Sequence, residues 1–251
     1  MYQLPKLSNT PELIHAFSDK SDGNMAVKFG AESEVYENRA GFLRKLKIET
    51  RQAVLMEVQH GTDIEFIDKG DSGKGMLPDV PGYKVDALVA MEDGVFPFLL
   101  VGDCLPIIMY DPQNRVTALA HLGWRNTDQK FIELLVSELK KECGTVPADL
   151  TVGIGPSIRK ESYIFKEGEV AERNLKWGSE FLIPIGRGNI AVDIAGYNIA
   201  QIVETGVKLD NIEISEVNTA QDQNYFSHYR SARIKREAEG RIATVVGMVW
   251  K

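Results

Sequence analysis

The chain has 251 residues, enough for one large domain or two small ones with a sizeable core. Its composition, 43% hydrophobic and 26% charged, is that of an ordinary globular protein. The net charge of −7, with Lys and Arg scattered along the chain, argues against nucleic acid or an anionic membrane as a partner. There is no apolar run of 18 residues and no apolar secretion signal, and two cysteines cannot make a disulfide framework. We therefore expect a protein of the reducing cytoplasm.

Apolar periodicity and turn residues predict the following elements in chain order. The first half contains a surface helix at 33–47, strands at 53–58 and 85–90, and a Gly-rich loop at 68–82. The second half contains helices at 126–142, 167–177 and 193–207, strands at 150–154, 189–192, 212–217 and 243–249, and an aromatic loop at 225–230. No repeat, linker or βαβ nucleotide-binding fingerprint interrupts them, so the sequence predicts one α+β domain over 1–251.

The stretch 98–125 holds two β-rich runs around the turn residues 111–114. A two-residue loop at this turn would place Cys104 directly opposite His121. Opposed side chains share a face, with β-carbons roughly 5 Å apart. Pro106 argues for an edge position or a bulge that could shift the pairing.

Three side chains with strong ligand atoms follow β-like runs: His60, Cys104 and His121. Two imidazoles and a thiolate form a familiar zinc set, and three protein ligands leave the fourth position open, as in catalytic sites. The spacing matches no short motif. Catalytic zinc, a metal-free Cys–His pair and buried inert side chains therefore all remain open on the residues alone.

Several short motifs follow one another in a known order. They are Gln59-His60-Gly61, Asp86-Ala-Leu-Val89, Asp103-Cys104-Leu-Pro106, Ala120-His121-Leu-Gly-Trp-Arg125, Gly155-Pro156-Ser-Ile158, Tyr225-Phe-Ser-His-Tyr-Arg230 and Gly240-Arg-Ile-Ala243. In this order the chain resembles the bacterial polyphenol oxidase or laccase-domain family, from about residue 12 to the end.

The resemblance implies that His60, Cys104 and His121 bind one Zn²⁺ ion. It also implies phosphorolysis of adenosine, inosine, guanosine and methylthioadenosine, and hydrolytic deamination of adenosine. The implied fold is a β-sandwich of mixed sheets flanked by helices, related to bacterial toxin deamidases with a Cys–His pair. Purine nucleosides and phosphate are then the partners of a monomer or small homo-oligomer.

Four further residues are predicted at the site. Arg39 matches the family's Asn-Arg motif and is a phosphate-clamp candidate, with a surface helix arginine as the alternative. Arg125 precedes a predicted helix amino terminus, which favours anions, although a structural salt bridge would use it equally. Asp103 would orient a zinc histidine or carry a proton, or else cap the turn at the strand end. Asn24 resembles the family's active-site Asn.

Aromatic residues near the carboxyl end give a further hypothesis. Tyr225, Phe226 and His228 would form a stacking wall for a purine, although a simply packed loop is the more ordinary interpretation. Trp124 and Trp250 are predicted to lie in the core.

The chain departs from the family pattern at several places. Leu122 and Asn126 replace small residues of the family, Ser157 replaces a cysteine, and the early Arg- and Gly-rich loop is shortened to 19–24. The number of available ligands excludes the laccase activity that the family name suggests. A multicopper oxidase needs a blue-copper site and a His-rich trinuclear cluster, and four histidines without a His-x-His pair cannot supply them.

Two other functions are weighed against the zinc enzyme. A metal-free hydrolase or deamidase using Cys104 and His121 would be sensitive to thiol alkylation and indifferent to chelators. A zinc-stabilised binding module would have no turnover to lose. Replacing Cys104 in such a module would impair its folding.

Overall fold

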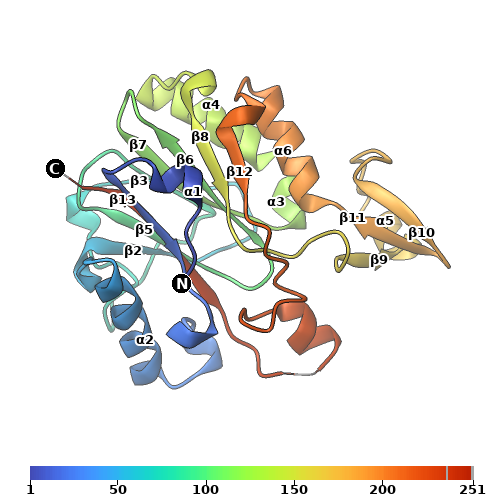
Figure 1. The fold of residues 1–251 in the computed structure, drawn as a ribbon, viewed down its shortest axis with the longest axis horizontal. Coiled ribbons are helices and arrows are strands. Elements are labelled where there is room, and N and C mark those ends of the chain that lie inside the picture. The colour runs from blue at the N-terminus through green and yellow to red at the C-terminus, as the bar shows by residue number, and fades with distance from the viewer. Residues whose placement is uncertain (236, 250–251) are drawn as a thin grey trace.

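The computed structural model describes residues 1–235 and 237–249, so Trp250 lies outside the described residues. A mixed six-stranded sheet forms its centre (Figure 1). In spatial order its strands are β12 (Ile212–Ile214), β8 (Thr151–Ile154), β6 (Leu105–Asp111), β7 (Val116–Leu122), β4 (Ala87–Ala90) and β3 (Ile64–Ile67). The two outermost pairs are parallel and the inner pairs antiparallel. Strands β6 and β7 are buried along their whole length, which explains their continuous apolar sequence.

A mixed four-stranded sheet packs on one face of the first. Its strands are β1 (Leu13–Phe17), β13 (Ile242–Met248), β5 (Phe96–Val101) and β2 (Ala53–Met56). One buried cluster joins the two sheets, with Ile108 and Leu119 from the larger sheet and Leu99 and Val246 from the smaller. The two sheets therefore form a sandwich.

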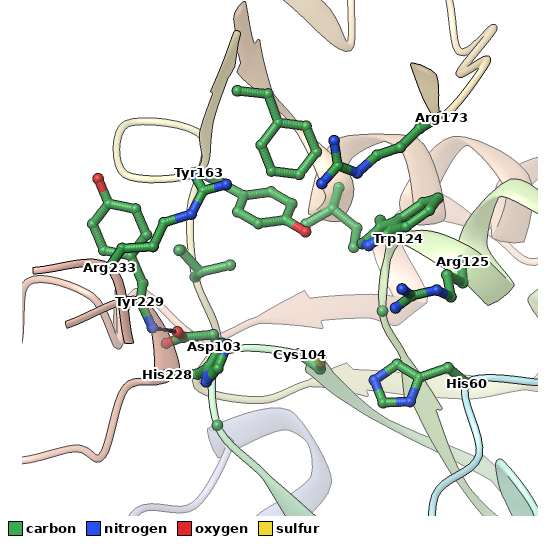
Figure 2. A pocket seen from close by; sticks show the side chains of 15 residues that line it. His60, Asp103, Cys104, Trp124, Arg125, Tyr163, Arg173, His228, Tyr229 and Arg233 are labelled. Carbon is green, nitrogen blue, oxygen red and sulfur yellow. Dashed lines mark hydrogen bonds between the residues drawn. The ribbon is translucent and has the colours of Figure 1, made fainter. Parts of the chain in front are cut away.

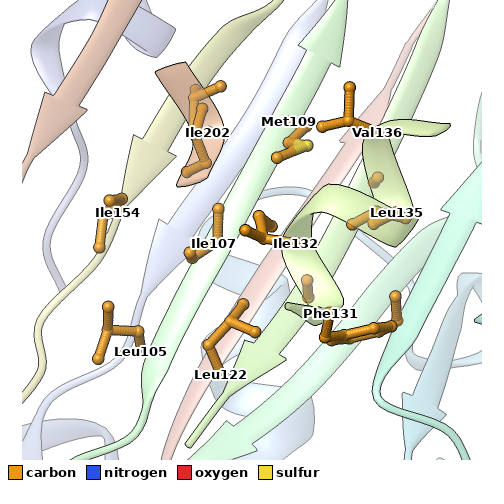
Figure 3. Packing of buried hydrophobic residues seen from close by; sticks show 14 of the residues in the cluster. Leu105, Ile107, Met109, Leu122, Phe131, Ile132, Leu135, Val136, Ile154 and Ile202 are labelled. Atoms are coloured by element: carbon orange, nitrogen blue, oxygen red, sulfur yellow. The ribbon is translucent and has the colours of Figure 1, made fainter. Parts of the chain in front are cut away.

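Helices cover both outer faces of the sandwich (Figure 1). The covering helices are α2 (Glu32–Lys45), α3 (Trp124–Asp128), α4 (Phe131–Cys143) and α6 (Ile194–Glu204). Helix α1 (Pro5–Ser8) instead buries Leu7 in the cluster between the sheets, and α5 (Glu167–Glu172) packs on β9 and β11. Figure 3 shows α4 packing Phe131, Ile132 and Leu135 against Ile107 and Leu122 of the six-stranded sheet. Helix α2 lies instead against the four-stranded sheet. The predicted α+β fold with mixed sheets and helices is confirmed. That residues 1–251 form one domain, and that the fold is related to that of toxin deamidases, stay predictions.

A small antiparallel sheet projects from the side of the molecule together with α5 (Figure 1). Its strands are β9 (Ile164–Lys166), β11 (Asn189–Val192) and β10 (Leu182–Gly186). The predicted strand at 189–192 is confirmed. The helix predicted over 167–177 ends at Glu172, and Asn174 has a left-handed φ of 53° that cannot continue a right-handed helix.

The predicted register of the central hairpin is wrong. Asp111 pairs with Val116, so the loop has four residues, and Pro106 rather than Cys104 lies opposite His121. The Asp111 carboxylate accepts hydrogen bonds from the backbone N–H groups of the next two non-proline residues and thereby shapes this longer loop. A shift of two residues keeps every side chain on its predicted face. Cys104 therefore becomes a diagonal neighbour of His121 and still lies on the same side.

The predicted helix at 126–142 is two helices. Lys130 has a left-handed φ of 57° and separates α3 from α4. Helix α3 starts earlier than predicted because the Asn126 side chain accepts a hydrogen bond from the Gly123 N–H at 2.8 Å, and caps the helix from within its first turn. Trp124 and Arg125 consequently sit at the beginning of α3. Gly144, with φ of 70°, ends α4 as predicted.

Buried His15 in β1 makes the stability of the fold depend on pH. Its Nε2 accepts a hydrogen bond from the Leu4 N–H at 2.9 Å, and burial lowers its pKa from 6.5 to about 4. The unfolded chain therefore takes up a proton first as the pH falls below 6.5, and the stabilising contribution of neutral His15 is lost progressively towards pH 4. From pH 7 to pH 5 we expect a loss of about 2 kcal/mol of unfolding free energy.

Urea unfolding of the wild type and His15→Gln at both pH values measures this loss. The variant should lack it, so the difference between the two proteins should change with pH. An identical pH dependence in both would contradict the assignment.

Candidate active site

Three ligand atoms converge at one end of the sandwich: one each from His60, Cys104 and His121. They lie within 4.8 Å of one another. His60 lies in the loop after β2, Cys104 in the turn between β5 and β6, and His121 in β7. The two imidazole rings meet edge to face with centroids 4.8 Å apart. The trio predicted from the resemblance is therefore brought together from three separate segments, despite the shifted hairpin register.

The donor set fits a zinc ion. Tetrahedral zinc with sulfur at about 2.3 Å and nitrogen at about 2.0–2.1 Å requires ligand atoms roughly 3.5 Å apart, so small side-chain rotations suffice. Gly123 keeps the neighbouring space open, because a Cβ there would lie 3.3 Å from both the Cys104 sulfur and the His60 ring.

Two residues at the floor of the site have left-handed backbones. His60 has φ of 59° and Asp103 has φ of 82°. Such conformations cost of order 1–3 kcal/mol in residues with side chains and persist only where the surroundings impose them. Hydrogen bonds to each residue supply that constraint. The N–H of His60 donates to the Asp86 carboxylate, and the carbonyl of Asp103 accepts from the Ile158 N–H.

Neighbouring charges favour a thiolate at Cys104 beside an imidazolium at His121. Burial disfavours the thiolate, but His121 and His60 outweigh it and lower the pKa of Cys104. Burial likewise disfavours the imidazolium, while Cys104 and Asp86 raise the pKa of His121. Asp86 stays ionised because hydrogen bonds from His121 and from backbone N–H groups overcome its burial and lower its pKa. A thiolate is the form of cysteine that binds metals and acts as a nucleophile.

A cavity of about 250 Å³ opens above the trio. Figure 2 shows His60 and Cys104 on its floor and Tyr163 above them, between Arg233 and Trp124. Within the described ranges the Tyr163 hydroxyl has no hydrogen-bond partner, and burial raises its pKa, so it remains a hydrogen-bond donor. The remaining lining residues are Gly102, Asp103, Gly123, Arg125, Ile158, Phe165, Arg173, Ile194, His228 and Tyr229.

Three arginines give the cavity a cationic side. The guanidinium of Arg125 lies 4.6 Å from the centre of the Trp124 ring, and that of Arg173 lies 4.6 Å from the Phe165 ring. Arg173 and Arg233 share the carboxylate of Glu169, with N–O distances of 3.7 and 3.0 Å. Over residues 1–235 and 237–249, Arg125 has no carboxylate within 4.0 Å, so it is the arginine available to an anion.

Asp103 lines the cavity with its carboxylate already engaged. It accepts hydrogen bonds from the Thr219 hydroxyl at 2.6 Å, the Ser227 hydroxyl at 3.0 Å and the Tyr229 N–H at 2.6 Å. Asp86, rather than Asp103, contacts a histidine of the trio. Asp103 thus joins the β5–β6 turn to the carboxyl-terminal loop, which supports its structural interpretation.

Arg39 and Asn24 do not line the cavity. Arg39 is buried in α2 and donates to the backbone carbonyls of Met25 and Gly75 at 2.8 and 3.1 Å. Asn24 accepts hydrogen bonds from the backbone N–H groups of Ala26 and Arg241 at 3.1 and 3.0 Å. Both side chains connect segments of backbone around the four-stranded sheet.

Of the two interpretations of the carboxyl-terminal aromatic loop, Tyr225 and Phe226 follow the packed loop and not the stacking wall. Tyr225 and Phe226 pack in the cluster between the two sheets, and of that predicted set only His228 lines the cavity. Trp124, predicted as core, is half-buried and faces the cavity. Tyr163 and Phe165 were missed by sequence reasoning. The only available signal was their alternation around Ile164, just after the Gly155–Ile158 turn.

This arrangement defines a class of protein: a two-sheet sandwich in which two histidines and a cysteine meet beneath a cationic, aromatic cavity. Residues 18–249 match the family described as multi-copper polyphenol oxidoreductase laccase, and the chain belongs to this family.

Named relatives are similar along most of the chain. A Geobacillus stearothermophilus protein named purine nucleoside phosphorylase YlmD is 30% identical over 89% of this chain and 82% of its own length. The Bacillus subtilis protein of that name is 23% identical over 96% of this chain and 90% of its own length. The crystal structure of the Geobacillus protein superposes with a TM-score of 0.86 at 27% identity, covering 98% of this chain and 94% of the other. No helix in the described part of the chain is long and apolar enough to cross a membrane.

Proposed function

We propose that this protein is a zinc-dependent purine nucleoside phosphorylase that also deaminates adenosine. The observation that carries the proposal is the convergence of His60, Cys104 and His121 beneath a cavity that has an aromatic wall and a cationic side. The names of the relatives give the nucleoside class additional support. Adenosine, inosine, guanosine and methylthioadenosine are the proposed substrates. A thiolate ligand suits the reducing cytoplasm proposed as its location.

His60, Cys104 and His121 would hold the zinc ion, which supplies Lewis-acid catalysis when bound. Trp124, which is half-buried beside the cavity, is the proposed stacking surface for a purine, whereas Phe165 is only 3% exposed and has the Arg173 guanidinium over its ring. The Tyr163 hydroxyl, which lines the cavity, would donate a hydrogen bond to an acceptor nitrogen of the base. These contacts would orient the nucleoside and exclude water from the glycosidic bond.

Phosphorolysis also needs an anion site beside the anomeric carbon of the ribose. Arg125 is the proposed phosphate ligand because its guanidinium lines the cavity without a described carboxylate partner. The buried contacts of Arg39 support a scaffolding role for that residue instead.

The test combines metal analysis with product analysis on one purified sample. Adenosine and inosine are incubated with and without phosphate, and chromatography resolves adenine, hypoxanthine and inosine. We expect near-stoichiometric zinc, base release that requires phosphate, and phosphate-independent conversion of adenosine to inosine. A folded protein that carries no zinc and turns over neither nucleoside would refute the proposal.

Arg125→Ala is expected to raise the KM for phosphate by about 10- to 100-fold, because a hydrogen bond to a charged group contributes about 1.5–3 kcal/mol. Steady-state kinetics with varied phosphate measures this effect. Arg187→Ala removes an exposed arginine that does not line the cavity and serves as the matched control. An unchanged KM for phosphate in Arg125→Ala would rule out this role.

A metal-free thiol enzyme is the second candidate. It is favoured by the spatial arrangement of Cys104, His121 and Asp86, in which His121 lies between the other two. The Asp86 carboxylate lies 2.8 Å from Nδ1 of His121, as the orienting group of a nucleophile–base–acid series would. This candidate predicts activity that survives chelation and is destroyed by iodoacetamide, whereas the zinc enzyme loses activity to a chelator and regains it with added Zn²⁺.

A further inference from the structure

Asp86 lies fully buried immediately before β4, and no step of the proposed reaction uses it directly. Four donors surround its carboxylate. Oδ1 accepts from the His60 N–H at 3.0 Å and lies 2.8 Å from Nδ1 of His121. Oδ2 accepts from the N–H groups of Gln59 at 3.2 Å and Gly61 at 2.8 Å.

In each of these four contacts the Asp86 carboxylate has to be the hydrogen-bond acceptor. An ionised carboxylate has no proton to donate and can accept at both oxygens. The backbone N–H groups can only donate, so Nδ1 of His121 must carry the remaining proton for the set to be satisfied. Nε2 of His121 is then the nitrogen left to the trio. The His121 N–H also donates to the Asp86 carbonyl at 2.9 Å, so the two residues are joined through backbone and side chain.

The same carboxylate controls the other histidine through its backbone. Three successive N–H groups, from Gln59 to Gly61, converge on it, and His60 in the middle has the left-handed φ of 59°. A left-handed residue with a side chain reverts to a commoner conformation when its constraint is removed. That change would carry the His60 imidazole away from Cys104 and His121.

We propose that Asp86 is the positioning residue of both histidines: it sets the His121 tautomer and the His60 backbone, and so pre-organises the site for a Zn²⁺ ion. The inference rests on the metal-binding part of the proposed function and is independent of which nucleoside the enzyme uses. Replacing the hydrogen-bond partner of a metal-binding histidine typically lowers metal affinity by 10- to 100-fold. Here a single carboxylate serves two of the three ligands.

Asp86→Asn tests the inference with little change in volume. The amide must point its NH₂ group either at the N–H groups of Gln59 and Gly61, which then lose their acceptor, or at the His60 N–H and at Nδ1 of His121, which then becomes an acceptor in the other tautomer. We expect Zn²⁺ affinity, measured by competition with a chelator and without nucleoside, to fall by about 10- to 100-fold. Asp111→Asn is the matched control. Asp111 is also a buried aspartate that accepts backbone N–H hydrogen bonds, but it lies at the far end of the same hairpin. It should leave Zn²⁺ affinity unchanged.

A spectroscopic readout does not depend on turnover. In wild-type protein with ¹⁵N-labelled histidine, His121 should show a slowly exchanging proton bonded to Nδ1, with or without zinc, assigned by its disappearance in His121→Gln. This measurement still decides the inference if Asp86→Asn does not fold or if the wild type turns over no nucleoside. A His121 without a proton on Nδ1, or an Asp86→Asn protein that binds Zn²⁺ as tightly as the wild type, would overturn it.

Discussion

Cys104→Ser is expected to lose stoichiometric zinc and to lower nucleoside turnover by more than about 100-fold. Losing an outer hydrogen-bond partner of a ligand already costs 10- to 100-fold, and loss of the ligand itself should exceed that. The serine hydroxyl stays protonated at neutral pH and does not replace a thiolate that His121 and His60 stabilise. Zinc per chain after dialysis against a weak chelator, together with turnover on the same sample, measures both effects.

Cys143→Ser provides the control. Cys143 is the other free cysteine and ends α4 away from the cavity, and its burial raises its pKa. Its replacement should leave zinc content and turnover as they are. A Cys104→Ser protein with full zinc content and full turnover would remove the thiolate from the site and with it the proposed ligand set.

Phe131→Ala is expected to lower the free energy of unfolding by about 3–5 kcal/mol. Phe131 is fully buried in the first turn of α4, within the cluster that joins this helix to the six-stranded sheet (Figure 3). Its removal leaves a cavity within this cluster, which the surrounding strands cannot close without moving. Urea unfolding monitored by circular dichroism measures the change.

Leu134→Ala supplies a control in the same helix. Leu134 lies on the other side of this helix, where 41% of its surface is exposed, because the inward side is formed by Phe131, Ile132, Leu135, Val136, Leu139 and Cys143. Its replacement should change the unfolding free energy by less than about 1 kcal/mol. Equal losses in the two variants would contradict the packing.

Local patterns were sufficient for much of the fold. Apolar alternation and turn residues placed most strands within a few positions, because those signals act over a handful of residues. The hairpin shows where such reasoning stops. The loop length depended on the hydrogen bonds of one side chain, Asp111, and the sequence does not reveal which of two turns that side chain stabilises. Cys104 still lies on the predicted face of the sheet only because the observed register differs from the predicted one by an even number of residues.

In the site, too, some residues could be predicted from the sequence and others were revealed only by the fold. The trio was singled out by its residue types and its positions after β-like runs, but its members lie 44 and 17 residues apart and no local rule joins them, so only the order of the family motifs favoured zinc over the alternatives. Asp86 and Tyr163 became visible only when separate strands and loops were assembled around the cavity. Arg39 was predicted as either a phosphate clamp or a surface arginine, because motif order does not say where a side chain points, and in the fold it is buried and binds backbone carbonyls.

X-ray absorption at the zinc edge of the purified protein tests the central claim most directly. The account predicts one sulfur neighbour at about 2.3 Å and two or three nitrogen or oxygen neighbours at about 2.0–2.1 Å, from Cys104, His60, His121 and an open position taken by solvent. The sulfur neighbour should disappear in Cys104→Ser. Zinc surrounded only by nitrogen and oxygen, or a folded protein that binds no zinc, would contradict the account.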